Sequence, residues 1–406
     1  MARENFKKIQ SLYNVVIEVL EVNKMNSKER VLKTINHEEP DRVPIGEWGI
    51  DHDHVSKIIG HHTYWRNRKD TTIALWEGKR DEVVESLKKD LVELEEKLDY
   101  DILVVELVPP KGYKPSDPPR KTGDGIWEDS KGNVYKYAAS NDSISCVTHP
   151  EAKEELTEDD ISACEDSINT KLDDSAFELI DFIGDKYGKE KAILCRDIDI
   201  YDVLLKPFGG DFNHQIMLPT IAPDEIKKMY PVGMEYNRKL IEHLKKHNVM
   251  IGMQGIDFGM NGRCIINPKN IRDVYFPIMK AVNEEIEKNG MISFFHCCGC
   301  IWDILDDYIG AGYKGYQSIQ ATAGMDTRLV KEKYGKQLTL WTGVQCETLV
   351  AGSMMDTERE VREGLKYLMP GGGFIFGSTN SVQFGASTDN YLKALEIVGK
   401  EGKYEK

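Results

Sequence analysis

The stretch from Met291 to Cys300, MISFFHCCGC, places a histidine and three cysteines directly after a short apolar run. The run ending at Phe295 predicts a strand, and strand ends deliver side chains to a sheet edge where loops build sites. His296 and Cys298 form a His-x-Cys pair, and neutral imidazole and thiolate are ligands that zinc prefers. Free cysteine is also among the most buried residue types, so a buried apolar role is the alternative. We favour a metal site.

The elements that must position this pair alternate between strands and helices with short connections, which indicates parallel βαβ units. A closed (β/α)8 barrel, the TIM barrel, is the predicted architecture, and a doubly wound open sheet is the second choice. Neither Gly-x-Gly-x-x-Gly after a strand nor a Walker-type loop is present, which disfavours nucleotide binding by the open sheet. Eight strands are expected, at about 42–48, 101–108, 192–196, 247–254, 291–295, 314–319, 338–344 and 373–377.

A third ligand is expected from a distant strand end. In a (β/α)8 barrel the carboxyl ends of all strands meet at one mouth, where the active site lies. Cys346 is 48 residues beyond Cys298, two βα units further round, and would face the same mouth. We predict zinc on His296, Cys298 and Cys346, with a fourth position left for substrate. Strand alternation turns Cys297 away and gives it a structural role, whereas Cys300 is a substitute ligand.

Other strand ends supply candidates for substrate chemistry. Asp257 follows the fourth strand and Glu47 lies near the end of the first. Each carboxylate is predicted to orient substrate or supply a proton, and a purely structural carboxylate is an equal alternative. The candidates for substrate binding are Trp48, Gln254, Trp341 and Asn380.

Composition limits the classes of partner. The 406 residues suffice for one large domain or two medium ones, and the formal net charge is -15. That charge argues against nucleic acid or an anionic membrane as partner, since both require basic patches. No segment approaches the roughly 18 consecutive apolar residues of a membrane span. Because the N-terminus lacks the pattern of a secretory signal and the eight cysteines form no disulfide framework, a cytoplasmic location is expected.

Two segments stand apart from the barrel pattern. Residues 1–24 predict an amphipathic helical arm that packs against the body or a partner subunit in a homodimer, or is a simple N-terminal extension. Residues 25–406 are assigned to the barrel. Between about 109 and 150, Pro, Gly and Asp cluster around a predicted β-hairpin whose turn is at 131–133. This insertion is too short for its own core, and such insertions often cover an active site.

From Met25 onward the sequence resembles the uroporphyrinogen decarboxylase superfamily. The resemblance implies a (β/α)8 barrel, as the strand count does. The motifs that carry it, in the order of the family, are Lys28-Glu-Arg-Val-Leu, Asp41-Arg-Val-Pro-Ile, Asp257-Phe-Gly, Asn267-Pro268, Phe295-His-Cys-Cys-Gly299, Gly324-Met-Asp326 and Gly371-Gly-Gly-Phe.

Within that superfamily the residues are more similar to one of two branches. True decarboxylases carry Arg-Gln-Ala-Gly-Arg near the N-terminus, whereas the corresponding segment 46–54 has no arginine and several acids. Such a loop is a poor site for a substrate with many carboxylates. The other branch, the zinc-dependent corrinoid methyltransferases, uses a His-x-Cys pair that His296 and Cys298 match. The third cysteine of its coenzyme M enzymes lies near the last strand, where this chain has 377–380 (GSTN), so Cys346 would replace it.

With its third cysteine at this different position, the chain resembles the methyltransferases that demethylate methoxylated compounds (O-demethylation) more than the coenzyme M enzymes. The resemblance thus implies a methyltransferase that uses Zn2+ and moves a methyl group between a small methylated compound and cobalt. Since no cobalamin-binding domain is recognisable, the corrinoid would be carried by a partner protein. Two alternatives stay open: a decarboxylase-like lyase that works without metal, and a catalytically silent binding barrel.

Overall fold

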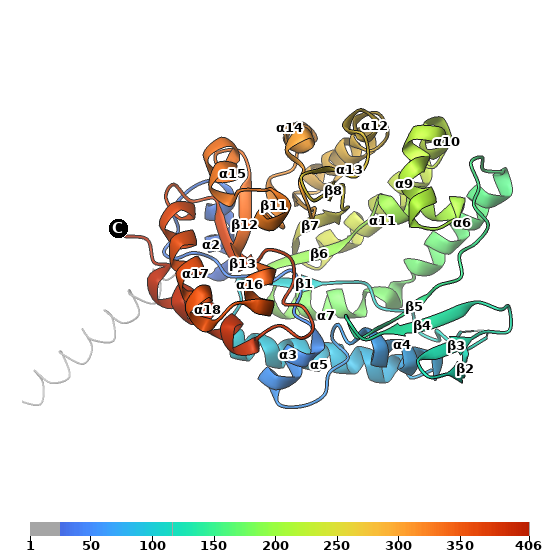
Figure 1. Ribbon diagram of the computed structural model, residues 1–406, viewed down its shortest axis with the longest axis horizontal. Coiled ribbons are helices and arrows are strands. Elements are labelled where there is room, and N and C mark those ends of the chain that lie inside the picture. The colour runs from blue at the N-terminus through green and yellow to red at the C-terminus, as the bar shows by residue number, and fades with distance from the viewer. Residues whose placement is uncertain (1–24, 116, 406) are drawn as a thin grey trace, which may run out of the picture.

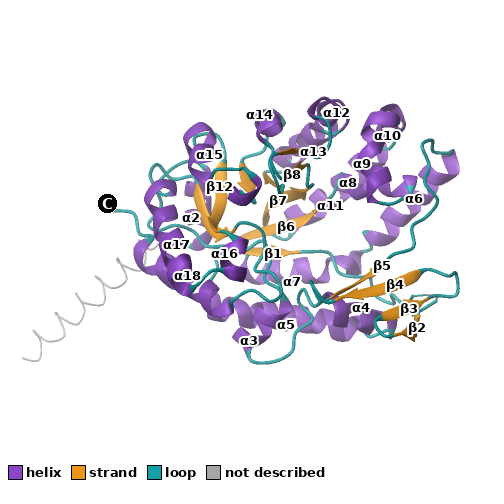
Figure 2. Ribbon diagram, in the orientation of Figure 1, coloured by secondary structure: helices purple, strands orange, loops and turns teal. Residues whose placement is uncertain are grey.

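The computed structural model describes residues 25–115 and 117–405, so the predicted arm at 1–24 lies outside the described residues (Figure 1). Seven parallel strands form one curled sheet in the order β1-β6-β7-β10-β11-β12-β13, with helices around it (Figure 2). The strands are β1 Ile102–Val105, β6 Ala192–Ile198, β7 Val249–Gly255, β10 Ile292–His296, β11 Gly315–Gln317, β12 Thr339–Val344 and β13 Phe374–Ser378.

The gap between the first and last strands is closed by the segment around Ile45. Ile45 pairs in parallel with Phe376 of β13, and Gly46 pairs in parallel with Ile102 of β1. This segment therefore occupies the eighth position, as bridges rather than as a regular strand. The predicted TIM-barrel fold is confirmed, and all eight predicted strand positions take part in it.

A buried carboxylate anchors the closing segment. Asp101 accepts a hydrogen bond from the Ile45 amide at 2.7 Å and pairs with Arg30 and Arg42, each at 2.6 Å. Asp101 is fully buried and Arg30 nearly so. Buried charges persist only when paired, so this cluster joins α2 (Ser27–Ile35), the closing segment and the start of β1.

The helices surround the barrel and build its rim. Short 3-10 turns lie at Asp174–Phe177, Lys206–Phe208, Trp302–Ile304 and Ala321–Ala323. The remaining helices are α3 His52–Ile59, α4 Arg68–Trp76, α5 Arg80–Leu98, α6 Glu158–Lys171, α7 Glu178–Tyr187, α8 Tyr201–Leu205, α9 Phe212–Ile221, α10 Pro223–Lys228, α11 Tyr230–Lys246, α12 Pro268–Val274, α13 Phe276–Lys288, α14 Leu305–Gly310, α15 Thr327–Tyr334, α16 Cys346–Ala351, α17 Met354–Leu368 and α18 Thr388–Glu401.

Strand alternation divides the apolar residues between two layers. In β1, Ile102 and Val104 belong to the cluster that fills the barrel, whereas Leu103 and Val105 belong to the cluster under the helices. Trp341 is fully buried in the inner cluster and donates its indole N–H to the Gly46 carbonyl at 3.1 Å. The barrel is therefore a packed core. None of the described helices is long and apolar enough to cross a membrane.

The insertion is larger than a hairpin. It forms a four-stranded antiparallel sheet in sequence order, beside α4 (Figure 1). The predicted turn at 131–133 lies between its two middle strands, and two further strands flank them. Since an isolated hairpin is only marginally stable in water, the outer strands stabilise the insertion. Trp76 of α4 packs on Trp127 and Tyr135. The strands are β2 Arg120–Gly123, β3 Ile126–Glu128, β4 Val134–Ala138 and β5 Ser143–Cys146.

Candidate metal centre and active site

Two neighbouring strand ends bring a histidine, a cysteine and an aspartate together. His296 ends β10, Cys298 follows it, and Asp257 follows the adjacent strand β7. The His296 Nε2 atom lies 3.3 Å from the Cys298 Sγ atom and 3.8 Å from the Asp257 Oδ1 atom. One ligand atom from each residue lies within 4.8 Å of the other two. Imidazole, thiol and carboxylate at this spacing form a donor set that suits zinc.

Two glycines allow the loops after β7 and β10 to touch. A Cβ on Gly259 would lie 2.4 Å from the Cys298 carbonyl oxygen, and a Cβ on Gly299 would lie 2.3 Å from the Gly259 carbonyl carbon. Gly299 also has a φ of +79°, which favours glycine. Met260 then bridges to Cys300. These contacts hold Asp257 beside Cys298, whose amide donates to the Asp257 carboxylate at 2.7 Å.

Gln317, at the end of the neighbouring strand β11, determines which ring nitrogen of His296 is available to bind a metal ion. The Gln317 Nε2 atom donates to the carbonyl oxygens of Ser378 and Asn380 at 3.2 and 3.1 Å. Its Oε1 atom therefore faces His296 and accepts a hydrogen bond from Nδ1–H. With the proton on Nδ1, the lone pair of Nε2 points toward Cys298. Such a partner on the second nitrogen is usual for metal-binding histidines.

The Cys298 thiol is half-buried and is held by polar neighbours. Asn380 donates its Nδ2–H to the Cys298 Sγ atom at 2.9 Å, and the Ser318 hydroxyl lies 3.3 Å from it. Burial, followed by the charge of Asp257, raises the pKa of Cys298 to about 12, and burial lowers the pKa of His296. A buried thiolate requires a cation beside it. The donors around the sulfur and the neutral imidazole suit a bound metal ion.

Trp48 forms one wall of the site. Its ring stacks on the His296 ring, with centroids 4.8 Å apart and planes 14° apart. The Arg196 guanidinium lies 5.8 Å from the Trp48 ring centroid. Trp48 follows the closing segment directly, so the closure of the barrel places the Trp48 ring against the imidazole.

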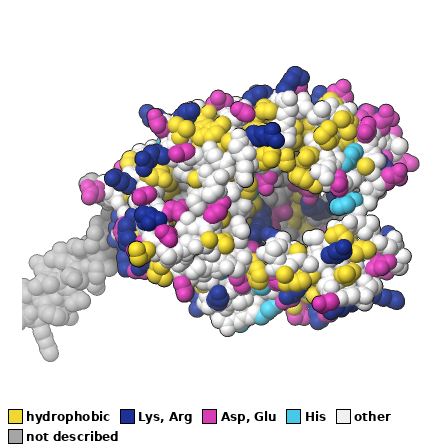
Figure 3. Space-filling model, viewed as in Figure 1, with side chains coloured by type: hydrophobic (Ala, Val, Ile, Leu, Met, Phe, Trp, Pro, Cys, Tyr) yellow, Lys and Arg dark blue, Asp and Glu magenta, His cyan; other side chains and the backbone are white. Residues whose placement is uncertain are grey.

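A cavity of about 660 Å³ opens beside Trp48, Gly255 and Asn380. Figure 3 shows this face hollowed between the upper helices and the insertion sheet. The Arg66 Nε atom lies 2.7 Å from the Asp51 Oδ1 atom. Arg196 is paired with Glu106, and burial lowers the pKa of Arg196 to about 9. The acidic side chains Glu106, Asp197, Asp199 and Asp202 line the same cavity, and the sequence analysis missed this charged lining because its members come from separate elements. The cationic side chains that line the cavity are Arg66, Arg68, Lys171 and Arg196.

Cys346 lies outside the cluster formed by His296, Cys298 and Asp257. It begins α16, and burial raises the pKa of its thiol to about 11. Its S–H donates to the Ser381 carbonyl at 3.4 Å. It lines a second cavity, of about 340 Å³, that it shares with Asn380. Asn380 lines both cavities and therefore lies between Cys346 and the larger one.

Two predicted substrate contacts lie away from both cavities. Gln254 is buried and donates its side-chain amide to Asn283 of α13 at 3.0 Å, so it faces the helical layer. Trp341 is part of the barrel core. Neither residue lines the cavities beside Cys298 or Cys346. The structure instead brings Trp48 and Asn380 to the candidate metal centre.

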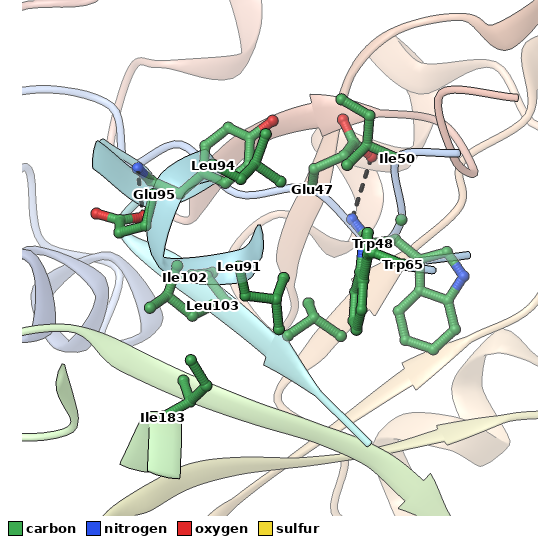
Figure 4. A pocket seen from close by; sticks show the side chains of 13 residues that line it. Glu47, Trp48, Ile50, Trp65, Leu91, Leu94, Glu95, Ile102, Leu103 and Ile183 are labelled. Atoms are coloured by element: carbon green, nitrogen blue, oxygen red, sulfur yellow. Dashed lines mark hydrogen bonds between the residues drawn. The ribbon is translucent and has the colours of Figure 1, made fainter. Parts of the chain in front are cut away.

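The Glu47 carboxylate is buried and serves the barrel closure. It accepts hydrogen bonds from the Ser378 amide at 3.0 Å, the Ser378 hydroxyl at 2.6 Å and the Trp48 amide at 3.1 Å. It borders a small internal cavity of about 30 Å³ between α5 and β1 (Figure 4). Burial raises the pKa of Glu47 to about 7. These contacts join the closing segment to the end of β13.

Glu47→Gln is expected to flatten the dependence of stability on pH. A raised folded-state pKa means that the stabilising contribution is complete below the unfolded value near 4.5 and is lost as pH rises through 7. For Glu47 this loss is about 3 kcal/mol in the wild type. Urea unfolding at pH 5 and pH 8 should show a smaller difference for the variant. The readout is the change in the pH slope between the wild type and the variant. Burial also raises the pKa of Glu95 to about 7, but Glu95 is present in both proteins and contributes equally to both slopes.

The exposed residue Glu363 provides a matched control. Glu363→Gln should leave the pH slope of the wild type unchanged. An equal slope for Glu47→Gln and the wild type would contradict the interpretation of Glu47 as a buried group that takes up a proton on folding.

A comparison with solved structures finds a methyltransferase from Methanosarcina mazei at a TM-score of 0.65 and 15% sequence identity. The match covers 93% of this chain and 99% of that one. The chain shares the fold of that methyltransferase. The YdhT protein from Bacillus subtilis matches at a TM-score of 0.40 and 9% identity over 94% of each chain. The D-psicose 3-epimerase from Clostridium cellulolyticum H10 matches at 0.36 and 12% identity, over 62% of this chain and 89% of that one.

Comparisons by sequence give no relative. No protein-family model matches the chain, and a search of curated proteins finds no match. The match to the methyltransferase from Methanosarcina mazei shows the fold alone.

Proposed function

We propose that this protein is a zinc-dependent methyltransferase that moves a methyl group between a small methylated compound and the cobalt of a separate corrinoid protein. The observation that carries the proposal is the His296–Cys298 pair at the mouth of the barrel, with Nε2 and Sγ 3.3 Å apart and Nδ1 facing the Gln317 side-chain oxygen. The fold shared with the methyltransferase from Methanosarcina mazei supports it. The resemblance of the motifs to the corrinoid methyltransferases adds to this support.

His296 and Cys298 would hold the zinc ion through Nε2 and Sγ. We assign Cys346 as the third ligand, because a thiolate is a softer donor than a carboxylate and this thiol shares a cavity with Asn380. Asp257, which lies in the same cluster as His296 and Cys298, is the competing ligand. The two assignments differ in the number of sulfur ligands, two against one.

Zinc held by thiolate and imidazole supplies a Lewis acid that polarises an ether oxygen or binds a thiol as thiolate. The chain's own residues prepare the place for that chemistry. Gln317 keeps the proton on Nδ1 of His296, and Asn380 donates to the Cys298 sulfur. Asp257, with 57% of its side chain exposed, is placed to orient a substrate or to accept and return a proton at its free oxygen.

The cavity beside Trp48 is the proposed substrate site. Its volume of about 660 Å³ lies in the range of small-molecule pockets. A methoxylated aromatic or similar compound would lie against the Trp48 ring, with Arg196 behind that ring. The corrinoid would approach across the open mouth, because the methyl group must pass directly to cobalt. A helix of the rim, α4, lines this cavity with Thr71 and packs on the insertion sheet, so the insertion borders the expected path.

Spectroscopy of the corrinoid tests the proposal. Zinc-loaded full-length protein is mixed with cob(I)alamin and a panel of methoxylated aromatics and other small methyl compounds. Conversion to methylcobalamin, followed by absorbance, is the expected result for at least one donor. His61→Gln, which changes a partly exposed histidine that is paired with Glu93 and lines neither cavity, should behave as the wild type does. Protein that holds no zinc at the mouth, transfers no methyl group and releases carbon dioxide from a carboxylated compound would establish the lyase alternative instead.

A further inference from the structure

A second group of metal-binding side chains lies in the helical layer, on α7 and α11. The Asp181 Oδ1 atom lies 2.8 Å from the His243 Nε2 atom and 3.6 Å from the His247 Nε2 atom. One ligand atom from each of the three residues lies within 4.8 Å of the other two. All three side chains are partly exposed, so ions from solvent can reach them.

We propose that Asp181, His243 and His247 bind a divalent transition metal ion, zinc above all, that joins α7 to α11. The two histidines are four residues apart, with His243 in the last turn of α11 and His247 at its C-cap, so their rings lie on the same face. Two imidazoles and one carboxylate are a ligand set found in zinc sites. This site contains no sulfur, and the proposal does not depend on the methyltransferase function.

The backbone brings the two helices close enough for such a link. A Cβ on Gly184 of α7 would lie 2.1 Å from the His247 carbonyl oxygen, a distance that no side chain tolerates. Glycine at this position therefore permits the contact. The His243 ring stacks on the rings of Phe177 and His247, with ring centroids 3.7 and 4.9 Å apart, respectively. The imidazoles are thus ordered before any ion binds, which lowers the entropic cost of binding.

The hydrogen bonds of His247 favour a cation at this place. Its Nδ1 atom lies 3.2 Å from the Asp185 carboxylate, which accepts the Nδ1 proton. In the neutral ring the Nε2 lone pair then faces the Asp181 carboxylate, and two acceptors face each other. A metal ion between them relieves this repulsion. A carboxylate on the outer nitrogen of a ligating histidine is a usual feature of metal sites.

Other histidines in the described part of the chain show how this group differs from an ordinary ion pair. His61 pairs with Glu93 at 2.7 Å and His62 with Asp70 at 3.0 Å. Each of these pairs has one imidazole and one carboxylate. The second imidazole beside Asp181 distinguishes the α7–α11 group.

Zinc stoichiometry tests this inference separately from the proposed function. After equilibrium dialysis against zinc, the full-length wild type should hold two ions per chain. The variant His296→Ala/Cys298→Ser should hold one, and so should His243→Gln/His247→Gln. Combining all four substitutions should leave none. His61→Gln is the matched control and should hold two. If His243→Gln/His247→Gln holds as many ions as the wild type, the α7–α11 site is overturned while the site at the mouth is unaffected.

Affinity and thermal stability provide independent readouts. Asp185→Asn should weaken zinc binding by about 10-fold in the variant that lacks the site at the mouth, as loss of an outer-shell carboxylate does. Zinc should raise the Tm of that variant, because a ligand that binds only the folded state stabilises it. Asp181→Asn in the same background should abolish the rise. A Tm that depends on pH but not on zinc would show that Asp181 and the histidines form only an ion pair, and would overturn the proposal.

Discussion

Cys298→Ser is expected to lose the zinc ion at the mouth of the barrel and to reduce methyl transfer to background. The substitution replaces a soft thiolate by a hydroxyl that does not ionise near neutral pH. Because Cys298 is a direct ligand in the proposal, the loss of zinc affinity should exceed the roughly 10- to 100-fold cost of removing an outer-shell partner. Zinc content and cob(I)alamin methylation, measured on the same preparation, check this expectation.

Cys297→Ser is the matched control. Its thiol is one residue away but buried in the opposite direction, where it accepts a hydrogen bond from the Phe258 amide at 3.3 Å. This variant should keep the zinc ion at the mouth. A Cys298→Ser protein with the zinc content and activity of the wild type would refute the assignment of this site.

Two further variants decide the third ligand. Cys346→Ser should lose zinc affinity if this thiol completes the site, whereas Asp257→Asn should then keep the ion and lose turnover. X-ray absorption at the zinc edge, measured on the His243→Gln/His247→Gln variant so that only the ion at the mouth contributes, should show two sulfur ligands. One sulfur ligand, with zinc lost in Asp257→Asn, would replace Cys346 by Asp257 as the third ligand and leave His296 and Cys298 in place.

Asp101→Ala is expected to be the most destabilising single substitution in the closing region. It removes the carboxylate that pairs with Arg30 and Arg42 and accepts from the Ile45 amide. Removing one partner of a buried ion pair leaves an uncompensated buried charge, which costs about 3 to 5 kcal/mol. The free energy of unfolding in urea should fall by this amount. Because Asp101 also holds the segment that leads to Trp48, the stacking of Trp48 on His296 should loosen.

A surface ion pair provides the comparison. Glu242 accepts from Arg238 at 2.7 Å along α11, with 51% of the Glu242 side chain exposed. Glu242→Ala should lower the free energy of unfolding by less than about 1 kcal/mol. If Asp101→Ala were no more destabilising than Glu242→Ala, the buried cluster would not be the anchor of the closing segment.

Local patterns in the sequence were sufficient to predict the barrel fold. The eight strand positions were predicted from apolar runs separated by helical segments, and all eight take part in the barrel. The first predicted strand forms only two isolated bridges, from Ile45 to β13 and from Gly46 to β1. Its pairing with these two neighbours is a tertiary contact that its own sequence does not encode. The predicted hairpin of the insertion is present, but its two outer strands were missed, since they have exposed faces and weak alternation.

His296 and Cys298 could be placed side by side from the sequence alone, because they lie two residues apart at one strand end. Their surroundings could be identified only in the folded structure. Gln317 orients the imidazole and Asn380 holds the sulfur, while Cys346 contacts Ser381 instead of the cluster. Spacing along the chain specifies which face a side chain takes. The distance between side chains on different strands depends on barrel closure and on loop contacts that no local pattern encodes.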